Sequence, residues 1–280
     1  MEKIAIISDI HGNLEALKVV LNDILKKGIT KIFCLGDIIA KGSCDKECLI
    51  LIRKRCQVIL KGNCESYFCN DENFNKAIKK EKSKLDFIWN KEKLSEEERN
   101  YLLNLPFCYE FYMSGSLIRL FHATPTKIDG CVSPMDNIRP KKEMFMPSEN
   151  TVSKNVADII IYGHTHVQTL EKIYNRTLIN VGSVGNEINV IRNKDFDADP
   201  KETTQAHYLI IEGEYESKSY NSPLSFQFIR IPYDIEKELE RNKDNPEKKA
   251  YINELKYGIY RDEEKLIKSF VQRGIDPEEF

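Results

Sequence analysis

Four of the five histidines in this 280-residue chain lie in turns that directly follow short apolar runs. The first such turn, residues 8–13, holds a carboxylate and an imidazole two residues apart. That pair alone is a weak signal, because polar residues in turns usually hydrogen-bond the backbone. The same arrangement recurs after four further apolar runs, however. The polar side chains at these five positions are Asp9, His11, Asp37, Asn63, His122, His164 and His166.

These seven side chains offer oxygen and imidazole ligands without thiolate, a set that suits a hard to borderline divalent cation. A lone histidine is more often a structural residue than a ligand. Four histidines in equivalent positions at the ends of apolar runs are far less readily explained that way. Because α/β sheets place their ligands at the carboxyl ends of the strands, we expect the seven side chains to meet at a metal site.

Strands and helices alternate in the first sixty residues, which positions the first three turns. Apolar runs at 4–7, 31–35 and 57–60 predict strands. A helix is predicted after Asn13, which can cap it, and a short one over 44–53. This β-α-β-α-β order predicts a mainly parallel sheet with right-handed crossovers.

The rest of the chain predicts further strands, an irregular segment and helices. A charged helical stretch spans 71–104, and a lid-like loop spans 123–150. The polar insertion at 192–205 has no assigned role, and the C-terminal 45 or so residues are helical. The predicted strands lie at 107–113, 116–121, 158–162, 168–173, 177–181, 207–212 and 225–231.

Composition excludes several classes of protein. Lys plus Arg number 42 and Asp plus Glu 44, so nothing in the charge calls for nucleic acid or an anionic membrane as partner. No apolar stretch approaches the roughly 18 residues of a membrane span. The start of the chain lacks the pattern of an export signal, so we expect a cytoplasmic protein.

The eight cysteines are expected to be reduced thiols in such a compartment. A four-thiolate zinc site built from Cys44, Cys48, Cys64 and Cys69 is a minor alternative. Their spacings are wider than the usual two-residue knuckle, which disfavours it.

The motifs Asp9-x-His11, Gly36-Asp37, Gly62-Asn63, His122 and Gly163-His164-x-His166 resemble, in the same order, those of the calcineurin-like metallophosphoesterases. The resemblance spans about residues 1–190. It implies an α/β fold, a four-layer α-β-β-α sandwich with two packed mixed sheets. We expect a single domain, with the sandwich over 1–232 and a helical C-terminal extension over 233–280.

The resemblance also implies a ligand set. One divalent metal would be held by Asp9, His11 and His166, and a second by Asn63, His122 and His164. Asp37 would bridge them. Manganese is the first expectation, with Fe, Co, Ni or Zn as alternatives. The activity implied is hydrolysis of a small phosphoester or phosphoanhydride through in-line attack by a hydroxide shared between the metals. The loop 182–185 would brace a ligand histidine, unless it is a plain glycine-rich turn.

One position departs from the family pattern. The third motif usually continues with a histidine and an acidic residue, whereas this chain has Cys64-Glu65. A neutral thiol is a poor substitute for an imidazolium as general acid, because it is uncharged and a weak donor, and such assistance is worth about 10²–10⁴-fold. Either the substrate has a good leaving group, or the 123–150 loop or His207 supplies the proton. The predicted catalytic residues are Asp37, Asn63 and Cys64, and the predicted substrate contacts are Asn63, Cys64 and His164.

A looser resemblance concerns the substrate. Asymmetrically cleaving dinucleoside tetraphosphate hydrolases of streptococcal type also replace this histidine, and they too have a Tyr-Asp pair, here Tyr233-Asp234, before the C-terminal helices. A nucleotide substrate is one hypothesis; a nuclease, or a catalytically weak scaffold on the same fold, are the alternatives. Basic residues that could hold further phosphates are Lys41, Lys61, Arg139, Lys141, Lys142 and Arg192.

Overall fold

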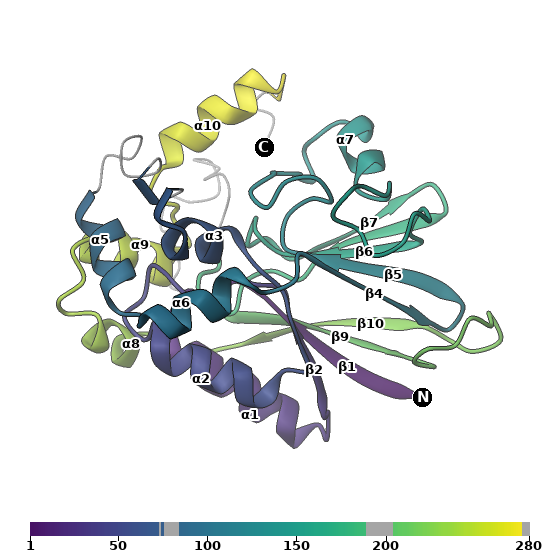
Figure 1. Ribbon diagram of the computed structural model, residues 1–280, viewed down its shortest axis with the longest axis horizontal. Coiled ribbons are helices and arrows are strands. Elements are labelled where there is room, and N and C mark those ends of the chain that lie inside the picture. Colours follow the sequence, from purple (N-terminus) through teal and green to yellow (C-terminus); the bar gives the residue numbers. More distant parts are fainter. Residues whose placement is uncertain (73, 76–83, 189–203, 276–280) are drawn as a thin grey trace.

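The computed structural model describes residues 1–72, 74–75, 84–188 and 204–275 (Figure 1). Its strands are β1 (Glu2–Ile7), β2 (Lys31–Cys34), β3 (Val58–Ile59), β4 (Cys108–Met113), β5 (Ser116–Phe121), β6 (Ile159–Tyr162), β7 (Thr169–Ile173), β8 (Arg176–Asn180), β9 (Ala206–Gly213) and β10 (Ser225–Ile231). Its helices are α1 (Leu14–Lys26), α2 (Asp45–Arg55), α3 (Asn63–Cys69), α5 (Lys84–Glu92), α6 (Glu96–Leu103), α7 (Ile138–Glu143), α8 (Ile235–Arg241), α9 (Lys248–Tyr257) and α10 (Glu263–Gln272).

Within these described ranges the strands form two five-stranded sheets. The first has the order β10-β9-β1-β2-β3 and the second β4-β5-β6-β8-β7. Both are mixed: β1 pairs parallel with β2 but antiparallel with β9, and β6 pairs parallel with β5 and β8 while β7 is antiparallel. The predicted class of two mixed sheets in an α/β fold is confirmed.

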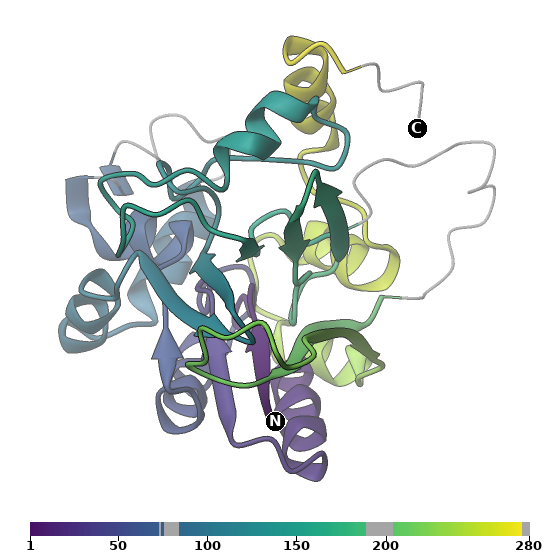
Figure 2. The same ribbon diagram turned by 90° about the vertical axis from the view of Figure 1, so that its right-hand side faces the viewer.

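Three apolar layers hold the sheets and helices together. Alternation along β1 shows how: Ile4 and Ile6 face the second sheet, whereas Ala5 and Ile7 face α1 and α2. The outer face of the second sheet packs against the segment that carries Val132, Met144 and Phe145. Figures 1 and 2 show the sheets stacked, with α1 and α2 on the outer side of the first. Among the described helices, none has the length and apolarity to cross a membrane.

Parallel pairing brings the predicted turns together. Because β1, β2 and β3 run in the same direction, the turns after them lie at one edge of the first sheet. The same holds in the second sheet for β5, β6 and β8. The two edges lie at the same end of the stacked sheets, so strand ends far apart in the sequence meet there (Figure 1).

Local interactions fix the ends of several elements, and the predicted cap of α1 is confirmed. Asn13 caps α1 by accepting a hydrogen bond from the Ala16 amide. Ser95 and Glu98 form the capping box of α6. The turn between β4 and β5 is at Ser114-Gly115, both with positive φ, which matches the right-handed twist of a hairpin.

Other predictions were wrong in extent. The third strand is only Val58–Ile59, two residues shorter than predicted. The 123–150 segment, predicted to be a loop, contains the helix α7. The sequence did not predict this helix because Pro140 and the adjacent lysines give no apolar period. Part of the charged stretch, 76–83, and most of the 192–205 insertion lie outside the described residues.

Candidate metal centre

The turns after β1, β2 and β6 hold their polar residues in the left-handed region of backbone space. The φ angles are 56° at Asp9, 51° at His11, 50° at Asp37, 67° at His164 and 63° at His166. Such angles are uncommon for residues other than glycine and cost on the order of 1–3 kcal/mol each. Backbone bonds between neighbouring turns hold them, including the Asp9 amide to the Gly36 carbonyl at 3.0 Å. Strain of this kind gathers at functional sites.

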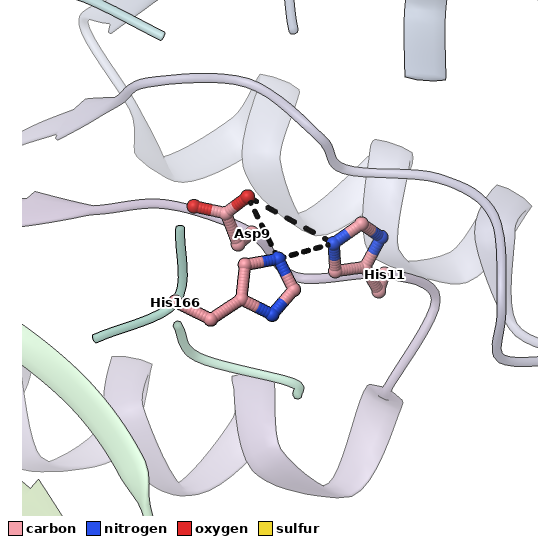
Figure 3. A group of neighbouring side chains, drawn as sticks. All are labelled: Asp9, His11 and His166. Atoms are coloured by element: carbon pink, nitrogen blue, oxygen red, sulfur yellow. Dashed lines mark hydrogen bonds and ion pairs between the residues drawn. The ribbon is translucent and has the colours of Figure 1, made fainter. Parts of the chain in front are cut away.

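Asp9, His11 and His166 form the first cluster (Figure 3). The Nε2 atoms of the two imidazoles are 3.0 Å apart, and Asp9 Oδ1 lies 3.3 Å from His166 Nε2 and 3.8 Å from His11 Nε2. All three side chains are buried, and Asp9 Oδ1 has no hydrogen-bond partner among the described residues. Three ligand atoms that face one another in this way fit a bound cation.

Asp37, Asn63, His122 and His164 form a second cluster beside the first. His122 Nε2 lies 3.5 Å from Asp37 Oδ2. The end of the Asn63 amide that points into the cluster lies 3.0 Å from His122 Nε2, 2.8 Å from His164 Nδ1 and 3.3 Å from Asp37 Oδ2. With its oxygen there, Asn63 faces only lone pairs, which a cation between them would satisfy. Asp37 reaches both clusters, since its Oδ2 is also 3.8 Å from His11 Nε2.

The orientation of three imidazoles also fits a metal. The Nδ1 atom of His122 faces the Leu35 carbonyl at 3.0 Å, and that of His11 faces the Ile39 carbonyl at 3.3 Å. His166 Nδ1 faces the Asn186 carbonyl in the same way. A ring that donates its Nδ1 proton to a carbonyl leaves the Nε2 lone pair for a metal, as is usual for ligand histidines.

Glycines let the turns pack against these carboxylates. A Cβ on Gly62 would lie 2.1 Å from Asp37 Oδ1, and one on Gly163 would lie 2.5 Å from Asp9 Oδ2. Any side chain at these positions would displace a carboxylate. The glycines beside Asn63 and His164 therefore serve close approach, here to the carboxylates themselves.

Glu65 supports the site from beneath, a role that the sequence does not reveal. Its buried carboxylate accepts hydrogen bonds from the backbone amides of Asp37 at 2.9 Å, Ile38 at 2.8 Å and Gly62 at 2.7 Å. Burial, together with the charge of Asp37, raises its pKa to about 7. One side chain thus fixes the turn after β2 to the turn after β3.

Burial dominates the electrostatics of the metal-free clusters. It raises the pKa of Asp37, and it lowers the pKa of His164 to about 3 with help from the neighbouring charge of His122. Burial works in the opposite direction at His122, but the carboxylates of Asp37 and Asp9 raise its pKa on balance. Two carboxylates and four imidazoles in such a buried space would be better satisfied around divalent cations.

Cys64 lies against Asp37. Its Sγ donates to Asp37 Oδ2 at 3.2 Å and its backbone amide donates to Asp37 Oδ1 at 2.8 Å. Burial and the Asp37 carboxylate raise the pKa of the thiol well above its usual value, so the group stays neutral. The side chain at the position of the expected histidine therefore carries no positive charge.

A cavity of about 680 Å³ opens over the clusters. Its base includes His11, Asp37, Asn63, His164 and His166. Its opposite side, which we call the C-terminal wall, consists of Tyr260, Leu266, Ser269 and Phe270. The sequence shows Leu266 and Phe270 only as apolar residues of the helical C-terminal stretch, and nothing in their spacing places them over the strand ends. A third side is formed by Cys131, Ser133, Pro134 and Met135 from the predicted lid.

The basic residues predicted to hold further phosphates differ in their position relative to the cavity. Lys41 lines the cavity, whereas Lys61, Arg139, Lys141 and Lys142 do not, and Arg192 lies outside the described residues. His207, considered as a proton donor, is buried on β9, does not line the cavity, and has a pKa that burial lowers to about 3. Its position disfavours that role.

The loop 182–185 braces the first turn rather than a histidine. The amides of Val184 and Gly185 donate to the carbonyls of Ser8 and Asp9, both at 3.0 Å. It is the carbonyl of Asn186, just beyond the loop, that meets a ligand histidine, His166.

The four-thiolate alternative finds no support in the described residues. All eight cysteines are free. The groups of side chains close enough to hold a metal include Cys64 next to His11 and Asp37, but none of the other three cysteines.

Comparison with known proteins agrees with this geometry. Residues 2–195 match the model of the calcineurin-like phosphoesterase superfamily domain, so the chain belongs to that family and is a metal-dependent hydrolase. It is 30% identical over 244 residues to an uncharacterized protein of Methanocaldococcus jannaschii, with 85% of this chain and 90% of that protein covered.

Two solved structures share the fold. A metallophosphoesterase of Sphaerobacter thermophilus has a TM-score of 0.64 at 22% identity, over 92% of this chain and 100% of that one. A hypothetical protein of Pyrococcus horikoshii has a TM-score of 0.70 at 20% identity, over 93% and 100%. At this level of identity they show the fold alone, and the chemistry must be argued from the site.

Proposed function

We propose that the chain hydrolyses a small phosphoester or phosphoanhydride at a centre of two divalent metals. Asp9, His11 and His166 would hold one metal, and Asn63, His122 and His164 would hold the second. Asp37 would contact both metals. The observation that carries the proposal is the convergence of these side chains. The ligand atoms of Asp9, His11, Asp37, His122 and His166, all buried, lie within 4.8 Å of one another in overlapping groups, and the Asn63 amide lies 3.0 Å from His122 and 2.8 Å from His164. Two cations there would neutralise phosphate oxygens and lower the pKa of a shared water.

The residues of the chain have separate tasks in this proposal. The carbonyls of Leu35, Ile39 and Asn186 orient the imidazoles. Asn63 and His164 lie toward the cavity and would contact the phosphate as well as the metal. Cys64 lines the same cavity, where its neutral thiol leaves the departing group without a strong acid.

This lack of an acid favours substrates whose leaving group departs as a stable anion. Phosphoanhydrides, including dinucleoside polyphosphates, meet that condition without protonation. A cavity of about 680 Å³ lies within the size range of ligand pockets, about 300–1,000 Å³. We therefore propose a nucleotide or polyphosphate substrate. We also propose manganese as the metal, because the carboxylate and amide oxygens at the site suit this cation and imidazoles complete the ligand set.

We also propose that the C-terminal helices belong to the same domain as the sandwich. Tyr233 accepts a hydrogen bond from Asn13 at 3.2 Å, and Arg241 of α8 donates to Glu15 of α1 at 2.9 Å. The C-terminal wall completes the cavity, so the sandwich and the helices would share one function.

The test begins with metal-free protein reconstituted with manganese. We expect about two metals per chain by elemental analysis and hydrolysis of bis(p-nitrophenyl) phosphate and diadenosine tetraphosphate. A chelator should abolish turnover and added metal should restore it. If no ester or anhydride is turned over with Mn, Fe, Co, Ni or Zn, the hydrolase proposal is wrong for these substrates.

The leaving-group argument has a test of its own. Cys64→His should change the rate little when the leaving group is p-nitrophenolate, as in methyl p-nitrophenyl phosphate, because this group departs without protonation. With an alkyl leaving group the rate should rise, up to about 10²-fold, because the histidine can protonate it. Cys69→Ala, in the same helix, is the matched control. Equal effects on both leaving groups would show that the missing histidine does not set the substrate class.

A further inference from the structure

Lys41 is held at the cavity by an unusual stretch of backbone. It lies four residues after Asp37 and has a φ of 63°, and Ala40 before it has a φ of 77°. The Lys41 carbonyl accepts a hydrogen bond from Asn245 Nδ2 at 2.8 Å, so the C-terminal segment holds this turn. Among the described residues that line the cavity, Lys41 alone is a lysine or arginine.

The ammonium group is held in place but keeps unused hydrogen-bonding capacity. Its Nζ donates to Asn186 Oδ1 at 2.5 Å. The nearest carboxylate oxygen, Glu254 Oε1, is 3.7 Å away, which is an ion pair but too long for a hydrogen bond. An ammonium has three N–H donors. The contacts with described residues occupy one of them, and the side chain is still 16% exposed.

Glu254 is engaged mainly by another residue. Arg261 donates to both of its oxygens, at 2.8 and 2.9 Å, and Asn186 Nδ2 donates to Oε2 at 3.2 Å. A lysine needed only to neutralise Glu254 would be expected within hydrogen-bond distance of it. Lys41 instead lies 3.7 Å from this carboxylate and lines the same cavity as His11, Asp37 and Cys64.

We propose that Lys41 binds a phosphate oxygen of the substrate and supplies the positive charge that Cys64 cannot. The proposal rests on the proposed phosphohydrolase function and names a further residue of the same site. A phosphate that enters the cavity completes the free donors of the ammonium, and a charge-assisted hydrogen bond of this kind is stronger than a neutral one. Glu254 and Asn186 act as positioning residues, because they hold the side chain of Lys41 toward the cavity.

Phosphate binding and turnover test the proposal separately. Lys41→Met removes the ammonium, and Lys41→Gln keeps a hydrogen-bonding end without the charge. Lys3→Met is the control, since Lys3 is exposed, pairs with Glu212 at 3.8 Å and does not line the cavity. Calorimetry measures the affinity of manganese-loaded protein for inorganic phosphate, and kinetics measure kcat and KM for bis(p-nitrophenyl) phosphate.

We expect both Lys41 variants to keep two metals per chain and to bind phosphate about 10- to 100-fold more weakly, as the loss of a hydrogen bond to a charged group implies. The value of kcat/KM should fall by a similar factor, while Lys3→Met changes neither quantity. Unchanged phosphate affinity in Lys41→Gln with full metal content would overturn the proposal. If the wild-type protein turns over no ester, the phosphohydrolase function fails, but weaker phosphate binding by the variants would still support the role of Lys41.

Discussion

The turns that carry the candidate ligands and the C-terminal wall opposite them are held by different forces. The turns are fixed by backbone hydrogen bonds between strand ends and by the buried Glu65. The wall is attached by side-chain ion pairs: Arg261 with Glu254, and Arg273, directly after α10, with Asp136 of the facing loop. Backbone bonds in a buried sheet edge change little with salt or pH, although the Glu65 carboxylate that also holds the turns has a pKa raised to about 7 by burial and the charge of Asp37. Ion pairs depend on both salt and pH.

This difference assigns distinct consequences to the two regions. Changes in the turns should abolish chemistry, because they alter ligands or the distances between them. Changes in the wall should alter stability and substrate affinity and leave the chemical step largely intact. The predictions below probe the two regions in decreasing order of expected effect.

Asp37→Asn should give the largest loss. The variant keeps the shape of the side chain but removes the charge shared by both clusters, so we expect turnover to fall by about 10³-fold or more. Metal content should fall from two to one or none, measured by elemental analysis. Asp244→Asn, at an exposed position, is the control. Activity within tenfold of wild type would show that the turns do not hold the metals through Asp37.

Glu254→Gln should destabilise the wall. It leaves Arg261 and Lys41 beside a neutral amide, and breaking a buried ion pair costs about 3–5 kcal/mol. Although burial opposes it, the charges of Arg261 and Lys41 lower the pKa of Glu254 to about 2, below its ordinary 4.5. The stabilisation is therefore complete above pH 4.5 and is lost as the pH falls toward 2.

Urea unfolding of wild type and Glu254→Gln from pH 7 to pH 3 measures this difference. The gap between the two proteins should narrow as the solution becomes acidic. Glu240→Gln, exposed on the neighbouring helix α8, should match wild type at every pH. A gap that is constant with pH would mean that the charge of Glu254 contributes nothing.

Glu238 of α8 should show the opposite pH dependence. Burial raises its pKa to about 7, despite hydrogen bonds from the Glu15 amide and from Asn242 and Tyr251 that favour its charged form. The folded protein binds this proton more tightly than the unfolded chain does. Stability is therefore lost as the pH rises from 4.5 to 7, by up to about 3 kcal/mol.

Glu238→Gln removes that titration. The variant should be more stable than wild type at pH 8 and lose the advantage near pH 5, as measured by thermal melts in both buffers. If the difference in stability between wild type and Glu238→Gln is the same at pH 5 and pH 8, the raised pKa of Glu238 is contradicted.

Arg273→Met should have the smallest effect. The guanidinium donates to both oxygens of Asp136, at 2.9 and 2.7 Å, but it is partly exposed, so the pair is worth about 1 kcal/mol or less. We expect KM for bis(p-nitrophenyl) phosphate to rise by about fivefold or less with kcat unchanged. High salt should have a similar effect on the wild type. Lys268→Met, exposed on α10, is the control.

Much of the candidate site could be predicted from the sequence because its residues are tied to strand ends. A strand that is read from an apolar run predicts where its turn lies, and parallel pairing brings such turns to one edge. Asp9, His11, Asp37 and the later histidines were found in this way. The alternation predicted the parallel pairing of the first three strands, whereas the two mixed sheets were expected from the family resemblance, with which family membership agrees.

The parts that were missed lack such a link. Glu65 reads as one acidic residue among 44, and its role depends on three amides that only the folded turns bring to it. Helix α7 has no apolar period. The apolar side chains that cover the outer face of the second sheet, Val132, Met144 and Phe145, lie before and after the helix in the sequence. The predicted third strand likewise keeps only Val58 and Ile59, which pair with Phe33 and Cys34 of β2, and the apolar run does not show where this pairing stops.

The sequence by itself determined the seven candidate ligands and the absence of the expected histidine at Cys64, since both follow from local order along the chain. Only the tertiary structure decided that Lys41, Glu254 and the C-terminal wall meet at the same cavity. The physical reason is sequence separation: Lys41 and Glu254 are more than two hundred positions apart. No periodicity spans that distance, and their contact depends on how the C-terminal helices pack against the strand ends.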